Sequence, residues 1–332
     1  MGQMRESQWQ MMGTVITMKI PETWELKGTG KANVGVAEPL LQTAEAYLRQ
    51  QEQRFSANSP TSELAQVNQL AGSGQWLPIH PQLFDLIAVG RKHSLASGSQ
   101  LNIAIGPLVQ TWRIGFDDAK VPSPQAITQL LGKTDPQKIQ LDFNKKAVLL
   151  EESGMKIDLG ALAKGYIADC LMIKLRQAQV PWAMLNLGGN LVVYGENPNQ
   201  VDNSWHIGIQ DPTKQRNHTL ALLRLTSDSS QTFAGQWSVV TSGIYERHLH
   251  VGDREYHHIL NPQTGYPQAT DVISLTILSH ESILGEIWTT RLFGKNKAEI
   301  LTCVEALPDM EALVIDKELQ ISKTSGVAAL LL

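Results

Sequence analysis

Hydrophobic residues in the first half of the chain recur at helical spacing. Between residues 38 and 55, Leu40, Leu41, Ala44 and Leu48 fall on one face of a predicted helix. Pro residues after Ser or His, and the same spacing elsewhere, predict further helices. The predicted helices span residues 38–55, about 59–70, 80–94, 106–112, 161–178, 282–293 and 296–307, with a short helix starting at residue 123.

Alternating and β-branched residues predict strands, most of them in the second half of the chain. The predicted strands span residues 12–20, 139–143, 147–151, 155–159, 182–187, 191–194, 206–210, 220–225, 238–241, 247–251, 254–260, 272–278 and 312–315. This order favours the α+β class, with a helix-rich first half and a second half rich in antiparallel strands. We expect two lobes with a binding site between them.

The overall composition narrows the functional classes. The chain has 332 residues and a net charge of −4, so we expect no broad basic surface for nucleic acid. No apolar run approaches the roughly 18 residues that would predict a transmembrane segment. Cys170 and Cys303 have no metal-site spacing and are expected to be buried thiols. No signal peptide is evident, so we expect a cytoplasmic protein, or a periplasmic, inner-membrane-associated one if an export segment has been removed.

The segment 241–267 concentrates hydroxyls, histidines and turn glycines around a predicted hairpin. His257 and His258 are neighbours in the return strand, where adjacent side chains point to opposite faces. Only one of them can therefore face a given cleft. Further ligands at zinc-site spacing are not evident, so one histidine that handles a proton or contacts phosphate is the simpler hypothesis.

A second polar segment, 156–169, joins a predicted strand to a predicted helix. Asp158 ends the strand, and Lys164 and Asp169 lie on the helix. Free amides at a helix N-terminus beside a lysine can bind phosphate. Without more context, a capped core helix with solvated Lys and Asp side chains is the favoured reading.

Two weaker signals also have a structural and a functional interpretation. Gly188-Gly189 could admit a ligand closely, although a tight hairpin turn is the favoured reading from spacing alone. Glu286 and Thr290 share a helix face, and their oxygens would suit Mg²⁺. Taken alone, an exposed Glu beside a back-bonded Thr is favoured there.

Seven short motifs occur in order between Met12-Gly13-Thr14 and the helix around Thr290. They are Phe55-Ser56 with Ser62-Glu63-Leu64 and Asn68; Gly106-Pro107-Leu108-Val109 with Trp112; Asp158-Leu159-Gly160-Ala161-Leu162-Ala163-Lys164-Gly165-Tyr166 with Asp169; Asn186-Leu187-Gly188-Gly189; Thr241-Ser242-Gly243 with Tyr245-Glu246-Arg247; His257-His258-Ile259 with Pro262; and Thr264-Gly265-Tyr266-Pro267. By these motifs the chain resembles the FAD:protein FMN transferase family, the ApbE-type flavin transferases.

The resemblance implies one flavin transferase domain with two lobes over residues 12–332, of T-fold-like architecture, preceded by an N-terminal extension of residues 1–11. It implies a Mg²⁺-dependent protein flavinylation reaction. A Thr or Ser hydroxyl of an acceptor protein would attack the FMN phosphorus of FAD, and AMP would leave. The alternatives are hydrolysis of FAD to FMN and AMP, and FAD binding or assembly without catalysis.

The resemblance also assigns residues to these roles. His258 and Lys164 would be catalytic, and the metal would be held by the backbone carbonyl of Ala161 and the side chains of Glu286 and Thr290. Residues expected at the FAD site are Met12, Asn58, Gln100, Leu101, Asn102, Asp158, Lys164, Gly188, Gly189, Thr241, Ser242, Gly243, His258 and Ile259.

Some of these positions depart from the family pattern. Asn58 stands where an aromatic side chain often stacks on adenine, which implies weaker adenine binding. Asn102-Ile103-Ala104 and Asn261-Pro262 replace Asp-x-Thr and Asp-Pro. Glu286 replaces the metal-binding aspartate, which implies weaker metal binding because Mg²⁺ demands near-ideal geometry.

Overall fold

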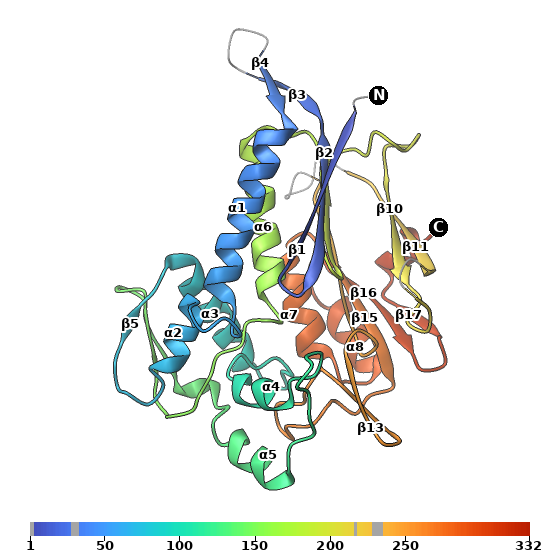
Figure 1. Ribbon diagram of the computed structural model, residues 1–332. Coiled ribbons are helices and arrows are strands. Elements are labelled where there is room, and N and C mark those ends of the chain that lie inside the picture. Colours follow the sequence, from blue (N-terminus) through green and yellow to red (C-terminus); the bar gives the residue numbers. More distant parts are fainter. Residues whose placement is uncertain (1–2, 28–32, 216–217, 228–234) are drawn as a thin grey trace.

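The computed structural model describes residues 3–27, 33–215, 218–227 and 235–332. An eight-stranded antiparallel sheet forms its centre (Figure 1), in the order β1-β2-β8-β9-β12-β15-β16-β17. Its strands are β1 (Met4–Met11), β2 (Thr14–Pro21), β8 (Ala183–Leu187), β9 (Asn190–Tyr194), β12 (Trp237–Gly243), β15 (Val272–Ser279), β16 (Glu311–Asp316) and β17 (Ile321–Lys323). Strand β2 lies near the start of the chain and pairs with β8, which lies in the second half, so this sheet joins both halves.

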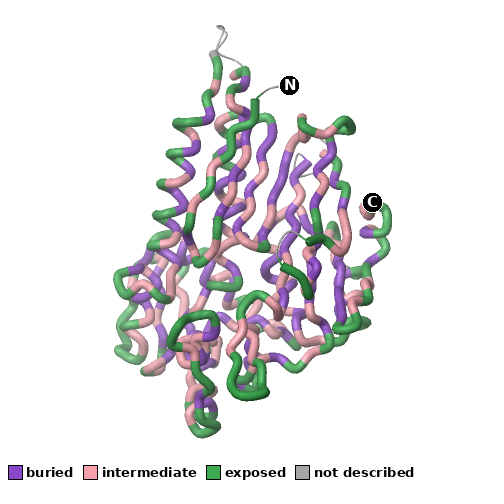
Figure 2. Tube along the Cα trace, turned by 45° about the vertical axis from the view of Figure 1, so that its right-hand side comes forward, coloured by how far each residue is buried: buried purple, intermediate pink, exposed green. Residues whose placement is uncertain are grey.

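Helices cover one face of the sheet. The long helices α1 (Ala37–Phe55) and α6 (Ala163–Gln177) lie beside each other, and α7 (Ser282–Leu292) and α8 (Lys297–Glu305) continue the layer below them (Figure 1). The largest hydrophobic core lies between this layer and strands β2, β8 and β9. Figure 2 shows the buried central strands and the exposed outer loops.

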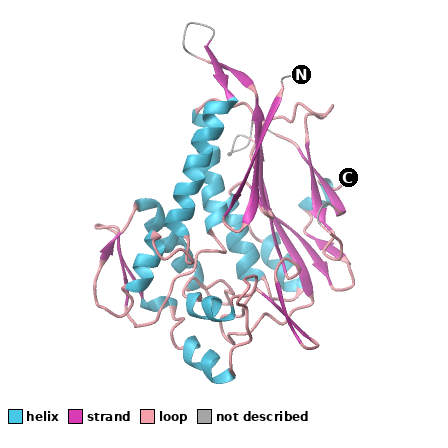
Figure 3. Ribbon diagram, in the orientation of Figure 1, coloured by secondary structure: helices cyan, strands magenta, loops and turns pink. Residues whose placement is uncertain are grey.

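The opposite face is partly covered by a two-stranded ribbon, β10 (Trp205–Gln210) and β11 (Thr219–Leu225). A second core there includes Trp182, Trp205 and, from the 3₁₀ turn η2 (Gly326–Ala329), Val327. Two short hairpins project from the body, β3 (Thr23–Leu26) with β4 (Asn33–Val36) and β13 (His248–Val251) with β14 (Arg254–His257) (Figure 3).

The remaining helices form the helical lobe. They are α2 (Glu63–Gln69), α3 (Pro81–Ser94), α4 (Gly106–Trp112) and α5 (Pro124–Leu131), with a three-stranded sheet of β5 (Leu77–Pro78), β6 (Ile139–Asp142) and β7 (Ala147–Leu150) and the 3₁₀ turn η1 (Pro136–Lys138). No helix in the described ranges is long and apolar enough to cross a lipid bilayer.

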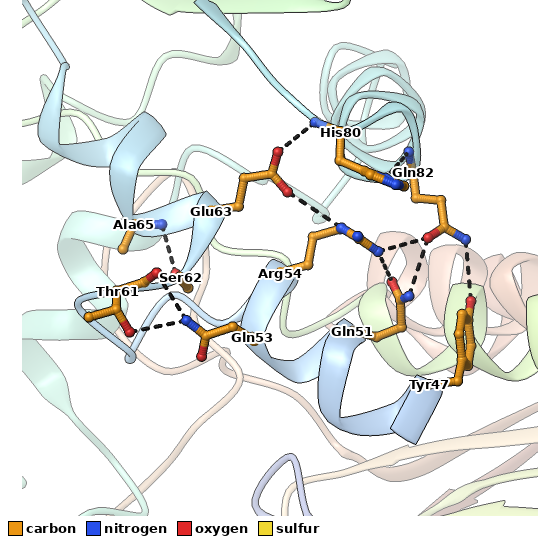
Figure 4. A network of polar contacts seen from close by, with 10 residues as sticks. All are labelled: Tyr47, Gln51, Gln53, Arg54, Thr61, Ser62, Glu63, Ala65, His80 and Gln82. Carbon is orange, nitrogen blue, oxygen red and sulfur yellow. Dashed lines mark hydrogen bonds and ion pairs between the residues drawn. The ribbon is translucent and has the colours of Figure 1, made fainter. Parts of the chain in front are cut away.

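A buried polar network connects α1, α2 and α3 within this lobe (Figure 4). The Arg54 side chain is 9% exposed; it donates to Gln82 Oε1 at 2.8 Å and Gln51 Oε1 at 3.0 Å, and it pairs with Glu63 at 3.4 Å. Ser62 caps α2 through a 2.9 Å bond from the Ala65 amide. The network holds both ends of the loop 56–62, which contains Asn58.

The α+β prediction is confirmed, and each predicted helix is present within a few residues of its predicted ends. The predicted strand 155–159 is wrong. This segment is extended but makes only a single parallel bridge, between Lys156 and Ile105, because it lies against a loop and has no neighbouring strand. Strand β12 continues through Ser242 and Gly243, which were expected to turn.

The chain start also takes part in the sheet. Residues 4–11 were expected as an extension before the domain, and in the structure they form the edge strand β1, paired along its length with β2. Cys170 and Cys303, expected to be buried, are free cysteines that are only partly buried.

Candidate active site

Glu286 on α7 is the most constrained of the predicted site residues. It is 5% exposed, and its Oε1 accepts a 2.8 Å hydrogen bond from Asn190 Nδ2. Lys164 Nζ lies 3.9 Å from the same oxygen. Burial raises the pKa of Glu286, while the charge of Lys164, the Asn190 amide and the backbone N–H of Gly165 oppose that rise. The favoured reading of Glu286 as an exposed side chain is therefore wrong.

Gly165 explains how α6 and α7 come so close. A Cβ atom there would lie 2.6 Å from the Ser282 carbonyl oxygen and 2.7 Å from Cγ of Glu286. Because real Cβ contacts are longer than this, only glycine fits without displacing α7. The first turn of α6 can then present a free amide to the carboxylate.

The three predicted metal ligands offer donor types that suit a hard divalent cation. Thr290 follows Glu286 by one turn on the same face of α7, and Ala161 lies in the exposed turn before α6. Together they supply carboxylate, hydroxyl and carbonyl oxygens, which Mg²⁺ prefers. Within the described ranges, no group of three His, Cys, Asp or Glu side chains could hold a metal.

Lys164 also reaches the turn between β8 and β9. Its Nζ donates to the Gly188 carbonyl at 3.3 Å. Gly188 and Gly189 both have positive φ, 63° and 86°, as a tight two-residue hairpin requires. The Gly189 carbonyl accepts from the Thr241 amide at 2.9 Å, which ties this turn to β12. Gly188-Gly189 therefore forms the expected hairpin turn, and this turn is compatible with the close approach of a ligand.

The hydroxyl of Thr241 is engaged within the sheet. Its Oγ1 lies 2.8 Å from Oγ1 of Thr276 on the neighbouring strand β15. Ser242 and Gly243 continue β12 toward the loop before β13. In this structure, Thr241 thus contributes its backbone to the site's framework.

The two adjacent histidines have different surroundings. His257 Nε2 lies 2.9 Å from the Gln268 carbonyl, and its Nδ1 accepts from the Ile259 amide at 3.3 Å. His258 Nδ1 is buried, and no described residue gives it a hydrogen-bond partner. Burial lowers the pKa of His258 to about 3; the charges of Arg247, His257 and Lys164 act in the same direction, and a hydrogen bond with the Arg247 backbone opposes it. His258 is therefore neutral near pH 7.

Asp158 lies in the same electrostatic neighbourhood. Its Oδ1 accepts from the Gly160 amide at 2.8 Å, which shapes the turn before α6. Burial raises the pKa of Asp158, and the Gly160 amide and the Arg247 guanidinium oppose that shift. Arg247 thus acts on both Asp158 and His258, although these residues come from different segments.

Met12 occupies the hairpin turn between β1 and β2. Its φ is 53°, and its amide donates to Glu52 Oε1 on α1 at 2.6 Å. The following residue, Gly13, lies beside the Arg247 guanidinium, because a Cβ there would be 3.3 Å from Nη2. The Met12 turn therefore lies beside the Arg247 side chain.

The segment 100–102 contacts the C-terminal end of α7. The Gln100 amide donates to the Arg291 carbonyl at 3.1 Å, and Leu101 is buried. The Asn102 side chain donates to the Thr134 carbonyl at 2.8 Å and accepts from the Ala104 amide at 2.8 Å. Asn102 therefore stabilises its own loop.

The predicted adenine-site residue Asn58 lies apart from the other predicted site residues in the described contacts. Asn58 is exposed, and its amide donates to Ser56 Oγ at 3.2 Å. Nothing in the described contacts links it to Lys164 or Glu286.

Asp169, which could have been solvated, accepts from the Ser282 and Ile283 amides at 2.8 Å and so caps α7.

The sequence assigned no role to two residues that lie at the candidate site. Asn190 follows Gly188-Gly189, and Arg247 ends the Tyr245-Glu246-Arg247 motif. Both residues belong to motifs in the sequence. The hydrogen bond from Asn190 to Glu286 and the position of the Arg247 side chain, however, depend on contacts between distant segments.

Comparison with known proteins identifies the family. The model of the ApbE family matches residues 12–314. The chain belongs to the ApbE family. A Klebsiella pneumoniae protein named FAD:protein FMN transferase is 36% identical over 288 residues, covering 87% of this chain and 85% of that protein. A Treponema pallidum protein of the same name is 32% identical over 300 residues, covering 86% and 80%.

Solved ApbE structures share the fold. The crystal structure of the ApbE protein from Thermotoga maritima has a TM-score of 0.82 at 22% identity and covers 99% of both chains. The flavin transferase ApbE from Vibrio cholerae has a TM-score of 0.80 at 22% identity and covers 100% of both. At this identity, the likeness supports the architecture alone.

Proposed function

We propose that this ApbE-family protein is an FAD:protein FMN transferase that moves FMN from FAD to a Thr or Ser hydroxyl of an acceptor protein. The observation that carries the proposal is the buried Glu286 carboxylate, held by Asn190 beside Lys164 at the first turn of α6. The names of the Klebsiella and Treponema relatives support the transfer of FMN from FAD to a protein.

The proposed reaction is a phosphoryl substitution. The acceptor hydroxyl oxygen forms a bond to the FMN phosphorus, and the bond from that phosphorus to the oxygen bridging to AMP breaks. The hydroxyl proton passes to a nearby base or to water, and AMP leaves with the bridging oxygen. Catalysis of such a step depends mainly on positioning and on neutralising phosphate charge.

Glu286, Thr290 and the Ala161 carbonyl would hold Mg²⁺. When bound, this ion would neutralise charge on the phosphate oxygens. The anchoring of Glu286 by Asn190 and Gly165 would keep the carboxylate in one orientation before the ion arrives. That orientation matters because Mg²⁺ tolerates little distortion.

Lys164 and His258 would act on the substrate. Lys164 is partly exposed and can donate to a phosphate oxygen while keeping its contact with the Gly188 carbonyl. His258 is neutral, with an unpartnered Nδ1, so it can accept a proton or a hydrogen bond. Bound phosphates would raise the pKa of His258 by adding negative charge.

A labelling assay tests the proposal. The protein is incubated with FAD, MgCl₂ and an acceptor flavoprotein domain, and products are separated on a denaturing gel and by chromatography. A fluorescent acceptor band together with one AMP per label is expected, and a Thr→Ala acceptor is the control. AMP and free FMN without a labelled acceptor would show hydrolysis instead, and bound FAD with neither product would show binding alone.

A further inference from the structure

Arg247 extends across the candidate site from the loop between β12 and β13. Its aliphatic stem lies against Gly115, in the loop after α4, where a Cβ atom would be 2.7 Å from Cδ and 3.2 Å from Cγ. Its Nη2 lies beside Gly13 in the turn between β1 and β2. The side chain therefore spans the space between a loop of the helical lobe and the edge of the main sheet.

The two glycines leave room for this path. Gly115 has a φ of 93° and Gly13 a φ of 69°, so both positions also favour glycine by backbone conformation. At Gly115 any side chain would collide with the arginine stem. The guanidinium thus lies beside the Met12 turn, where its charge acts on Asp158 and His258, while Arg247 as a whole remains exposed to solvent.

The guanidinium of Arg247 has no close polar partner among the described residues, and its charge acts on Asp158 and His258 from a greater distance. Other arginines differ. Arg54 is bound by Glu63, Gln51 and Gln82, and Arg113 pairs with Asp118 at 2.7 Å. An exposed cation near Asp158 and His258, without a hydrogen-bonded partner among the described residues, is available to an anionic ligand.

We propose that Arg247 binds the pyrophosphate oxygens of FAD together with Lys164, and neutralises the charge that develops as the bridging phosphate bond breaks. A guanidinium presents a planar set of donors that matches two phosphate oxygens at once. Lys164 and Arg247 both lower the pKa of His258, so both cations lie near this ring and could act on the same phosphates. This inference rests on the proposed function because it takes FAD as the ligand.

The test compares a charged and an uncharged flavin. Dissociation constants for FAD and riboflavin are measured by flavin fluorescence with Mg²⁺ present, for wild type and for Arg247→Gln, Arg247→Lys and Arg254→Gln. Loss of a charge-assisted bidentate contact should weaken FAD binding by roughly 10- to 100-fold in Arg247→Gln and leave riboflavin binding unchanged. Arg247→Lys should recover part of the loss, because it keeps the charge but not the fork.

Arg254 is the matched control, because it is an exposed arginine on strand β14 of the adjoining hairpin. Arg254→Gln should bind FAD like wild type. An equal loss of FAD and riboflavin binding in Arg247→Gln would indicate a structural role, and unchanged FAD binding would also overturn the proposal. Thermal melting without ligand checks that the variants remain folded.

A kinetic readout separates this inference from the proposed function. Adding guanidinium ions to Arg247→Ala should restore at least about tenfold of the lost rate of AMP release if the arginine stabilises phosphate charge. Wild-type protein that binds FAD more tightly than riboflavin but releases no AMP would contradict the transferase proposal while the binding comparison still tests Arg247. Wild-type protein that transfers FMN with an unaffected Arg247→Gln would contradict only the Arg247 inference.

Discussion

Asn190 donates a 2.8 Å hydrogen bond from Nδ2 to Oε1 of Glu286. Its own Oδ1 accepts from Ser282 Oγ at 2.8 Å, so the amide joins the start of β9 to two points on α7. All three side chains are buried. The orientation of the proposed metal ligand is therefore determined by a residue far away in the sequence.

Asn190→Ala should destabilise the protein by about 1–3 kcal/mol, because it leaves buried polar groups of Glu286 and Ser282 without a partner. Urea unfolding at pH 7 measures this change. Asn199→Ala, at an exposed position, should change stability by less than about 0.5 kcal/mol. Equal midpoints for the two variants would contradict the structural importance of Asn190.

Glu286→Ala should abolish Mg²⁺-dependent activity and Mg²⁺ binding measured by calorimetry, because it removes the only carboxylate of the proposed donor set. Glu286→Asp should keep or increase the activity, since it retains the carboxylate and restores the aspartate that the resemblance to the family implies at this position. If Glu286→Ala retains the wild-type dependence on Mg²⁺ concentration, Glu286 does not hold the metal.

His258→Gln should lower turnover and also change the pH dependence of stability. The pKa of His258 is about 3 in the folded protein and 6.5 for an ordinary histidine, so only the unfolded chain gains this proton in between. Stability contributed by the neutral ring is therefore full above pH 6.5 and is lost as the pH falls toward 3.

Urea unfolding at pH 7.5 and pH 5 measures that contribution. The loss of stability between these two pH values should be smaller in His258→Gln than in wild type. His250→Gln, on the exposed side of β13, is the control and should retain the wild-type difference. A wild-type pH dependence in His258→Gln would show that the ring is not protected from protonation.

Asp169→Ala should cost about 1–2 kcal/mol of stability, because Asp169 on α6 caps the amides of Ser282 and Ile283 at the start of α7. Asp169→Asn should cost less, since its amide oxygen can still accept one of these bonds. Chemical unfolding of both variants provides the comparison. An equal cost for the two would indicate that the carboxylate charge, and not the capping geometry, matters.

The pH dependence of this cap has a defined sign. Burial raises the pKa of Asp169 from 3.8 to about 6, so the folded protein retains a proton that the unfolded chain has lost. The contribution of Asp169 to stability should therefore fall as the pH rises from about 4 to 6. In Asp169→Asn this component should be missing from unfolding curves taken across that range.

Local sequence patterns predicted most elements of the fold. Helix α3 begins at Pro81 after His80, and α8 begins after Asn296, as their capping residues indicate. The strand expected at 155–159 failed, because an apolar extended segment becomes a strand only when another strand lies beside it. β1 was not predicted, because polar residues predominate at positions that face both sides of this strand. It becomes a strand through its pairing with β2.

The candidate site was predicted less completely. The motif positions of Lys164, Glu286 and Gly188 do come together in the structure. Sequence spacing alone favoured an exposed Glu286, because the period of a helix shows which residues share a face but not what covers that face. Asn190 and Arg247 gained roles only through their contacts.

By itself the sequence determined the family, the α+β class and the positions of the helices, because turn residues, capping residues and hydrophobic periods act over a few neighbouring residues. Only the tertiary structure decided which histidine has an unpartnered buried nitrogen, that Glu286 is buried, and that Asn190 is its partner. These outcomes depend on packing between segments about 100 residues apart. Burial and complementary shape select such contacts, and no local pattern encodes them.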